Sequence, residues 1–233
     1  MSTLVVIAKE CLPGAVKTRL TPPLSPAGAA RVAAASLEAT LRTARAVRAD
    51  RHVLFLQGAP PAAAADFDVL QQPAGTLDVR LAALFDAMTD RTLLIGMDTP
   101  QLERDVLQSV LDDDSGADAW FGPATDGGFW ALGMDRPRGD LIRGVGMSLA
   151  ATGAEQRARL TTAGLRVRDL PVVTDVDTID SARQVAALLP GSAFTAALHA
   201  ELLRPELLRT GLLRPELLDA ELPRVERLQP VAS

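Results

Sequence analysis

Short apolar runs alternate with longer helical patterns along most of this chain, and this alternation limits the folds it can adopt more than any other feature. Strands that alternate with helices of about ten or more residues are typical of βαβ units, whose crossovers are right-handed. The sequence therefore predicts an α/β fold in three layers, with a mostly parallel sheet flanked by helices. The strands are expected at residues 3–8, 52–57, 67–71, 92–96 and 165–169, and the helices at residues 25–48, 77–88, 102–111, 152–163 and 178–189.

Two segments depart from this alternation. Residues 117–122 and 128–133 form adjacent predicted strands around Asp126-Gly127-Gly128, which indicates a small antiparallel insertion. Near the C-terminus, Leu202–Leu208 recurs as Leu212–Leu218. Two copies are too few for a solenoid, and each proline is expected to start a fresh helical turn. The leucine pairs need burial, so this helical tail should pack on the domain or on a second copy in a homodimer, and no catalysis is expected there.

The composition narrows the class of protein. The chain has 233 residues, is 48% hydrophobic and carries a net charge of −5, so it can fill a core but lacks the basic excess of a nucleic-acid binder. No apolar run approaches the roughly 20 residues of a membrane span, and no signal-peptide pattern is evident. The single cysteine, Cys11, excludes an intrachain disulfide and fits a cytoplasmic location. His52 and His199 are far apart, which argues against a histidine-rich metal site.

A cation-rich loop follows the first predicted strand. Lys9, Lys17 and Arg19 supply positive charge and hydrogen-bond donors, and Pro13-Gly14 lets the backbone approach an anion. Ligands gather at the carboxyl ends of strands in α/β folds, so the loop predicts a phosphate site and, with it, a nucleotide. The alternative is an ordinary basic surface loop. Cys11 lies in the same loop, but without a histidine partner it is weak support for a nucleophile.

Three carboxylates follow strands at the expected carboxyl edge of the sheet. Asp98 comes directly after the run Leu93–Met97, and Asp175 and Asp177 lie two residues apart in an extended segment. Such oxygen ligands suit Mg²⁺ or Mn²⁺, so the sequence predicts a metal on Asp98 and Asp177, with Asp175 as a substitute. The alternative is that Asp98 and Asp177 cap the helices that follow them. The three aspartates at residues 112–114, at a helix end, are expected to be solvated instead.

The turn at Asp126-Gly127-Gly128 is open to two interpretations. Two consecutive glycines permit positive φ and close approach of a ligand, but they equally suit a simple hairpin. Four aromatic residues lie near this turn: Trp120, Phe121, Phe129 and Trp130. Either they pack together in the core, or one of them forms the wall of a pocket beside the turn.

Taken in order, five motifs resemble a known bacterial family. They are the loop with Lys9, Pro13-Gly14 and Val16–Leu20; Gln72 with Gly75–Leu77 and Arg80; Gly96–Pro100; Gly122–Trp130; and Asp175–Thr178 with Asp180. The pattern, over about residues 3–190, resembles the radical-SAM/selenodomain-associated transferase 1 family, also labelled arsenosugar-biosynthesis glycosyltransferases, in the GT-A superfamily of nucleotide-diphospho-sugar transferases. The N-terminal loop is similar to that of 2-phospho-L-lactate guanylyltransferase.

This resemblance implies a GT-A fold, with a nucleotide-binding transferase domain in residues 1–195 and the leucine-rich tail in residues 196–233. It also implies roles for individual residues. The phosphates are assigned to Pro13, Gly14, Lys17 and Arg19, the base to Gln72, Gly75 and Thr76, the acceptor to Asp126, Gly127 and Gly128, and the metal to Asp98 and Asp177.

Three functions fit these residues. The first is a metal-dependent nucleotidyltransferase that couples an NTP to a phosphorylated or phosphonate small molecule and releases pyrophosphate. There Lys9, Lys17, Arg19 and Asp98 are the catalytic candidates, because the reaction needs positioning and charge neutralisation. The second is a glycosyltransferase that moves a sugar from an NDP-sugar to a small acceptor, with Asp126 as the candidate base. The third is a non-catalytic nucleotide-binding protein. Asp98 is the only carboxylate at the end of its predicted strand, and the lack of a second one beside it favours the nucleotidyltransferase.

Overall fold

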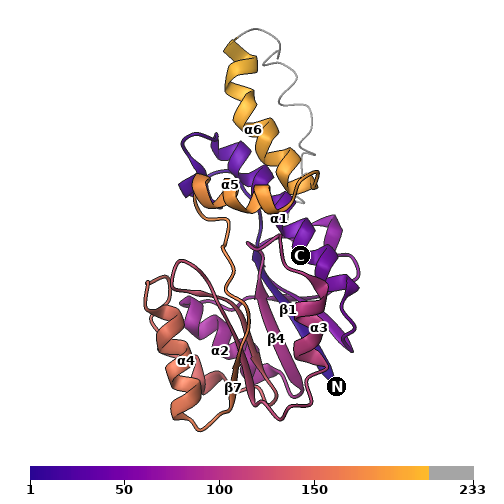
Figure 1. Ribbon diagram of the computed structural model, residues 1–233, viewed down its shortest axis with the longest axis vertical. Coiled ribbons are helices and arrows are strands. Elements are labelled where there is room, and N and C mark those ends of the chain that lie inside the picture. Colours follow the sequence, from indigo (N-terminus) through magenta and orange to yellow (C-terminus); the bar gives the residue numbers. More distant parts are fainter. Residues whose placement is uncertain (210–233) are drawn as a thin grey trace, which may run out of the picture.

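A seven-stranded sheet forms the centre of the molecule, and helices cover both of its faces (Figure 1). The computed structural model describes residues 1–209. The strands are β1 (Ser2–Lys9), β2 (Arg51–Gln57), β3 (Asp68–Gln71), β4 (Arg91–Gly96), β5 (Ala119–Pro123), β6 (Phe129–Met134) and β7 (Val167–Asp169). The helices are α1 (Pro26–Ala46), α2 (Leu77–Ala87), α3 (Arg104–Leu111), α4 (Thr152–Thr162), α5 (Ile179–Leu188) and α6 (Ala193–Arg209), with 3₁₀ turns η1 (Thr18–Leu20), η2 (Ala62–Ala64) and η3 (Gly139–Leu141).

The strand order in the sheet is β3-β2-β1-β4-β6-β5-β7. Parallel pairs join β1 to β2 and β4, β2 to β3, and β5 to β7, whereas β6 runs antiparallel to both β4 and β5. The predicted mostly parallel sheet with a small antiparallel insertion is therefore confirmed. Ile7 of β1 lies opposite Gly96 of β4, so the loops that follow these two strands leave the same edge of the sheet.

Alternate residues of the central strands supply two separate cores. In β1, Leu4 and Val6 pack with residues of α1 and α3, while Val5 packs with residues of α2 and α4 on the other face. All three side chains are fully buried. A strand covered on both faces needs a continuous apolar run, which explains why the sequence of β1 does not alternate between polar and apolar residues.

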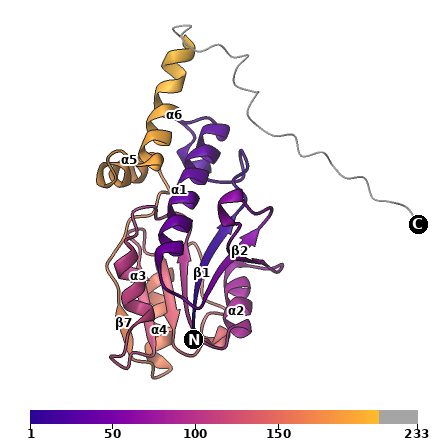
Figure 2. The ribbon, with the colours of Figure 1, turned by 90° about the vertical axis from the view of Figure 1, so that its right-hand side faces the viewer.

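Three helices form a lobe beyond the carboxyl edge of the sheet (Figures 1 and 2). The N-terminal half of α1 packs there with α5 and α6, around an apolar cluster that includes Leu20 of η1 and Phe194 of α6. Glu201 of α6 is buried and accepts two hydrogen bonds from Arg31 of α1, at 2.7 and 2.9 Å. A Cβ atom on Gly28 of α1 would lie only 2.7 Å from Glu201 Oε2. Any larger residue at position 28 would therefore crowd this carboxylate.

The helix α6, Ala193–Arg209, passes through Pro205 and reaches the last described residue. The prediction that Pro205 starts a fresh helical turn is therefore wrong. The turns before it are held on α1 and α5 by Phe194 and Glu201, and this tertiary packing outweighs the backbone hydrogen bond that a proline removes. The second copy of the repeat, Leu212–Leu218, lies outside the described residues, and the homodimer and the domain boundary at residue 195 stay predictions. Within residues 1–209, no helix is long and apolar enough to cross a bilayer.

The expectation that all three aspartates at residues 112–114 are solvated is wrong for Asp113, whose side chain is buried. Its side chain is only 3% exposed. It accepts hydrogen bonds from Trp120 Nε1 at 2.6 Å, Arg168 Nη1 at 2.9 Å and the Ser115 N–H at 2.9 Å. Burial alone would raise the pKa of Asp113, but these hydrogen bonds outweigh it and hold the pKa below its usual range. A helix-end position predicts solvent exposure only where no neighbouring strand offers donors.

Replacing Asp113 with Asn should lower the free energy of unfolding by about 2 kcal/mol near neutral pH, because hydrogen bonds to a buried charge are weakened. The pKa of Asp113 is depressed in the folded state, so its contribution is present above the unfolded pKa of about 3.9 and is lost as the pH falls towards the folded value. Urea denaturation between about pH 6 and pH 2.5 should show the difference shrinking. The exposed neighbour provides the control, since Asp114→Asn should change stability by less than about 0.5 kcal/mol. Equal losses in both variants would contradict this role.

Candidate functional site

The loop after β1 returns to the sheet edge through an unusual backbone conformation at Lys17. This residue has φ 48° and ψ 39°, in the left-handed region that non-glycine residues seldom adopt. Its side chain is 7% exposed, and Nζ lies 2.7 Å from Asp98 Oδ2 and 2.7 Å from Asp177 Oδ1. We call Lys17, Asp98 and Asp177 the lysine clamp.

The two carboxylates of the lysine clamp come from segments far apart in the sequence. Asp98 follows β4 and Asp177 precedes α5, and the N–H of Val176 donates to the Asp98 carbonyl at 2.9 Å. Neither carboxylate caps a helix, because Glu103 holds the N-cap position of α3 and Thr178 caps α5. The helix-cap interpretation is therefore wrong for both aspartates.

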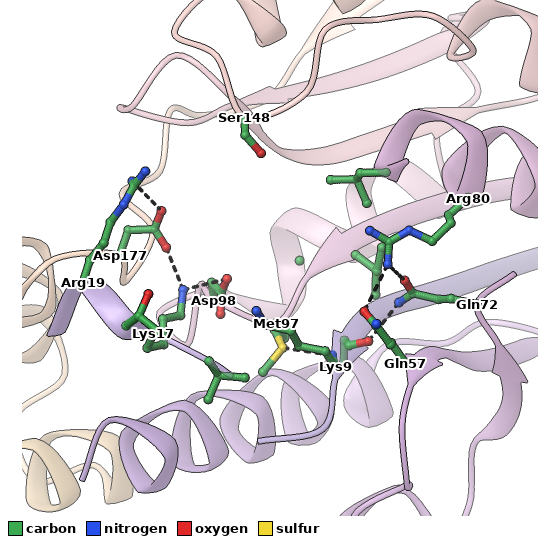
Figure 3. Close-up of a pocket in the computed structure, with 16 residues that line it drawn as sticks. Lys9, Lys17, Arg19, Gln57, Gln72, Arg80, Met97, Asp98, Ser148 and Asp177 are labelled. Carbon is green, nitrogen blue, oxygen red and sulfur yellow. Dashed lines mark hydrogen bonds and ion pairs between the residues drawn. The ribbon is translucent and has the colours of Figure 1, made fainter. Parts of the chain in front are cut away.

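The lysine clamp forms one end of a cavity of about 470 Å³ at the carboxyl ends of β1 and β4 (Figure 3). Lys9 and Arg19 line the same cavity. Lys9 Nζ donates to the Ala15 carbonyl at 2.9 Å and so ties the cation-rich loop to β1. Arg19 is 74% exposed, and its Nη1 lies 3.9 Å from Asp177 Oδ2. The structure thus brings together the predicted cations and the predicted metal-binding pair.

Polar side chains line the opposite end of this cavity, which we call the larger cavity to distinguish it from a smaller neighbour described below. Gln72 Nε2 donates to the carbonyls of Ala8 and Phe55, both at 2.9 Å. Arg80 Nη1 donates to Gln72 Oε1 at 2.8 Å and to Gln57 Oε1 at 3.2 Å. Sequence reasoning assigned Gln72 to the base but gave Arg80 and Gln57 no role. The only signal for Arg80 was its place in the second motif of the resemblance.

Four residues predicted to contact the nucleotide lie outside the lining of the larger cavity: Pro13, Gly14, Gly75 and Thr76. Gly14 and Gly75 have positive φ values of 76° and 124°, so they shape the turns that carry their neighbours. Thr76 holds the N-cap position of α2. Their contact with a nucleotide stays a prediction.

A second cavity, of about 280 Å³, shares Asp98 and Asp177 with the first. Asp126 and Gly128 of the predicted turn line it, as does Asp175, whereas Gly127 does not. The turn joins β5 to β6, and the Gly128 N–H donates to Asp126 Oδ1 at 2.8 Å. The hairpin interpretation is therefore confirmed, and the same turn borders a cavity.

The aromatic cluster divides between the two roles considered for it. Trp120 and Phe121 are buried in the core, while Phe129 and Trp130 line the smaller cavity. Trp130 is itself only 3% exposed, and its Nε1 donates to the Pro171 carbonyl at 3.0 Å. The ring thus acts as a rigid wall.

Ionisable groups in the two cavities influence one another strongly. Burial alone would lower the pKa of Lys17, but the carboxylates of Asp98 and Asp177 outweigh it and raise the pKa, so the lysine stays protonated. Burial raises the pKa of Asp98 in spite of Lys17. Burial, with repulsion from Asp126 and Asp177, raises the pKa of Asp175 to about 6. Closely spaced carboxylates of this kind are stabilised in their charged form by a bound cation.

Cys11 does not have the properties of a nucleophile. Burial, followed by the negative charge of Asp98, raises the pKa of the Cys11 thiol to about 11. The reactive thiolate is therefore scarce near neutral pH.

Sequence reasoning missed the segment that closes the smaller cavity. Residues 147–149 line it, and Ser148 has a positive φ of 61°. The residues that follow this segment, Ala150 and Gly153, pack on the turn between β5 and β6. The Gly153 N–H donates to the Gly127 carbonyl at 2.8 Å, and a Cβ atom on Gly127 would lie 2.1 Å from the carbonyl oxygen of Ala150. No periodic pattern marks the segment, so only the glycine at position 127 could have indicated this close approach.

Comparison with known proteins places the chain in a family. Residues 31–149, about half of the chain, match the profile of a family described as uncharacterized protein conserved in bacteria (DUF2064), and the chain belongs to this family. No curated protein matched the chain in sequence.

Solved structures share the architecture. The chain superposes with a TM-score of 0.76 on the crystal structure of a Desulfovibrio desulfuricans G20 protein assigned as a nucleotide-diphospho-sugar transferase, with 24% identity over 90% of this chain and 97% of that one. A cytidylyltransferase from Leptospira borgpetersenii serovar Hardjo-bovis gives a TM-score of 0.52 at 12% identity, over 88% and 95% of the two chains. At these identities the likeness is one of fold, and it confirms the predicted GT-A-like α/β fold with its mostly parallel sheet.

Replacing Gly127 with Ala should destabilise the protein by more than the strain of a positive φ alone, because the new methyl group would overlap the Ala150 carbonyl. Gly164 provides a matched control. It has a similar φ of 80°, and a Cβ atom there would meet nothing within 4 Å. Gly164→Ala should cost about 1–2 kcal/mol, and Gly127→Ala clearly more, as measured by chemical denaturation. Equal losses would show that Ala150 does not pack on the turn.

Proposed function

We propose that this chain is a metal-dependent transferase that takes a group from a nucleotide in the larger cavity and passes it to a small acceptor in the smaller one. The observation that carries this proposal is the lysine clamp, whose carboxylates stand on the wall that the two cavities share. A group transferred between substrates in these cavities would pass this shared boundary. There the ammonium group of Lys17 is already held between the carboxylates of Asp98 and Asp177. Phosphate chemistry depends on such charge placement.

Carboxylates at the shared wall and in the adjoining smaller cavity fit a divalent metal. Asp98 Oδ1 and Asp175 Oδ1 are buried without a hydrogen-bond partner among the described residues, so each keeps lone pairs for a cation. Carboxylate oxygens of Asp126, Asp175 and Asp177 lie within 4.8 Å of one another. Asp98 and Asp177 would hold Mg²⁺ or Mn²⁺, with Asp175 as the substitute ligand. The ion would supply positive charge against the phosphates of the nucleotide.

Three basic residues, Lys9, Lys17 and Arg19, would complete the phosphate site. Lys17, protonated and buried, would donate to the phosphate oxygens nearest the clamp, and Arg19 at the exposed mouth would bind the outer phosphates with its forked guanidinium. Lys9 would hold the loop through Ala15 and add charge at the end of β1. Transfer then depends on alignment and on stabilised negative charge, and a histidine is not needed.

In the first form of this proposal the transferred group is the nucleotidyl group of an NTP, and pyrophosphate leaves. The single carboxylate after β4 and its partner before α5 support this form. The acceptor would be a phosphorylated or phosphonate small molecule, whose charge the metal would have to offset. The narrower assignment to the radical-SAM/selenodomain-associated transferases is part of this proposal.

A second form, glycosyl transfer from an NDP-sugar, is favoured by the smaller cavity. Its lining among the described residues includes four aspartates and neither lysine nor arginine. Such a surface repels an anionic acceptor but suits a hydroxyl group, and Asp126 would remove the proton from that hydroxyl.

Replacing Asp98 or Asp177 with Asn should remove the metal-dependent part of nucleotide binding. With Mg²⁺ or Mn²⁺ and a nucleotide at about 100 times its Kd, the parent protein should gain about 2.7 kcal/mol, and the variants much less. A thermal-shift screen of NTPs against NDP-sugars measures this gain and shows which donor binds. The exposed Asp105 on α3 gives the control, because Asp105→Asn should keep the full gain. A parent protein that responds to no nucleotide with either metal would sink the proposal.

Asp126→Asn distinguishes the two forms. Under glycosyl transfer it should lower turnover by about 10²–10⁴-fold while nucleotide binding is kept, because a general base is lost. Under nucleotidyl transfer to an ionised oxygen, turnover should persist. Pyrophosphate release from an NTP and nucleoside diphosphate release from an NDP-sugar, measured for parent and variant, decide between them.

A further inference from the structure

The larger cavity has two ends of different chemistry. Lys17 and Arg19 bring charge to one end, whereas Gln57, Gln72 and Arg80 line the other with amide and guanidinium groups (Figure 3). The phosphates of a nucleotide belong with the lysine clamp, which leaves the opposite end for the base. In this respect the inference rests on the proposed function.

Arg80 is fixed at that end by uncharged partners. Gln72 cannot turn its amide over, because its Nε2 donates to the carbonyls of Ala8 and Phe55. Its Oε1 is therefore committed to accepting from Arg80 Nη1, which also donates to Gln57 Oε1. The orientation of the guanidinium is set by these contacts before any ligand binds.

The guanidinium keeps donors for a ligand. Figure 3 shows it directed from α2 into the cavity. Within the described part of the chain it forms no ion pair with a carboxylate, and its buried Nε has no hydrogen-bond partner. Nη1 is committed to the two glutamines and Nε is buried, so the N–H groups of Nη2 are the ones left for an acceptor from outside the protein.

The acceptor is more readily a base than a phosphate. Leu77, one turn before Arg80 on α2, lines the same cavity, and an apolar side chain suits a flat ring. Arginine can only donate, and the two N–H groups of Nη2 suit acceptors such as O6 and N7 of guanine or O4 of uracil. Adenine places an amino donor where guanine has O6, so two donors would face each other. We infer that Arg80 selects a nucleotide whose base presents a keto oxygen where adenine carries its amino group, which is O6 of guanine or O4 of uracil.

Equilibrium binding to the full-length protein tests this inference. GTP, UTP and ATP are titrated with Mg²⁺ into the parent protein and into Arg80→Gln and Arg80→Lys. The parent should bind GTP or UTP at least about tenfold more tightly than ATP, and both variants should bring these affinities within about twofold. Arg80→Lys keeps the charge and loses the fork, so it separates base recognition from attraction to phosphate. Urea denaturation of each variant verifies its fold.

Arg19→Gln is the matched control at the other end of the cavity. It should weaken all three nucleotides alike and leave the preference among them unchanged. A parent protein that binds ATP as tightly as GTP and UTP would overturn the inference, and so would Arg80 variants that weaken every nucleotide by the same factor. Nucleotide binding without base preference leaves the proposed function standing, whereas absence of binding by any nucleotide overturns both.

Discussion

The contact of Lys17 with Asp98 and Asp177 is the interaction on which the rest of the site depends. Two carboxylates this close would repel each other, and the ammonium between them makes the arrangement stable in a half-buried place. Its three members come from the loop after β1, the end of β4 and the segment before α5. One charged contact therefore joins the first strand, the centre of the sheet and the C-terminal part of the chain. The left-handed backbone at Lys17 is part of its cost.

The antiparallel strand β6 explains why both cavities open at one edge. Because β6 runs opposite to β4 and β5, the short turn at residues 126–128 joins the carboxyl end of β5 directly to the start of β6 at the edge where β1 and β4 end. A helical crossover would have brought the chain back from the far edge. The hairpin thus places Asp126 close to Asp175 and Asp177, which a wholly parallel sheet would not do by so short a connection.

Features that depend on residues close together in the sequence could be predicted from the sequence. The apolar runs predicted the strands, and Ser25-Pro26 predicted the start of α1. Positions at or just beyond strand ends predicted Lys9 and Asp98, because a strand end fixes where nearby side chains stand. Features that depend on distant partners were missed. Asp113 is buried because Trp120 and Arg168 donate to it from other strands.

The same limit applies to the tail and to the end of the larger cavity that Gln72 and Arg80 line. The helix passes Pro205 because α1 and α5 hold the preceding turns, and no pattern in the repeat reports that packing. In the sequence, Arg80 resembles any arginine on a helix surface. The role we propose for it depends on Gln72, which is hydrogen-bonded to β1 and β2 and accepts a hydrogen bond from Arg80. Pro13, Gly14, Gly75 and Thr76 were named from a motif, and the cavity lining does not include them.

The apolar cluster of the helical lobe has a consequence for the site. It contains Leu20, next to Arg19, and Val176, next to Asp177, together with Phe194 and Leu198 of α6. The helix that ends the described chain therefore braces both flanks of the lysine clamp. Docking of α6 and ordering of the clamp share these contacts, so by thermodynamic linkage the free energy by which docked α6 stabilises the clamp equals the free energy by which the ordered clamp stabilises docked α6.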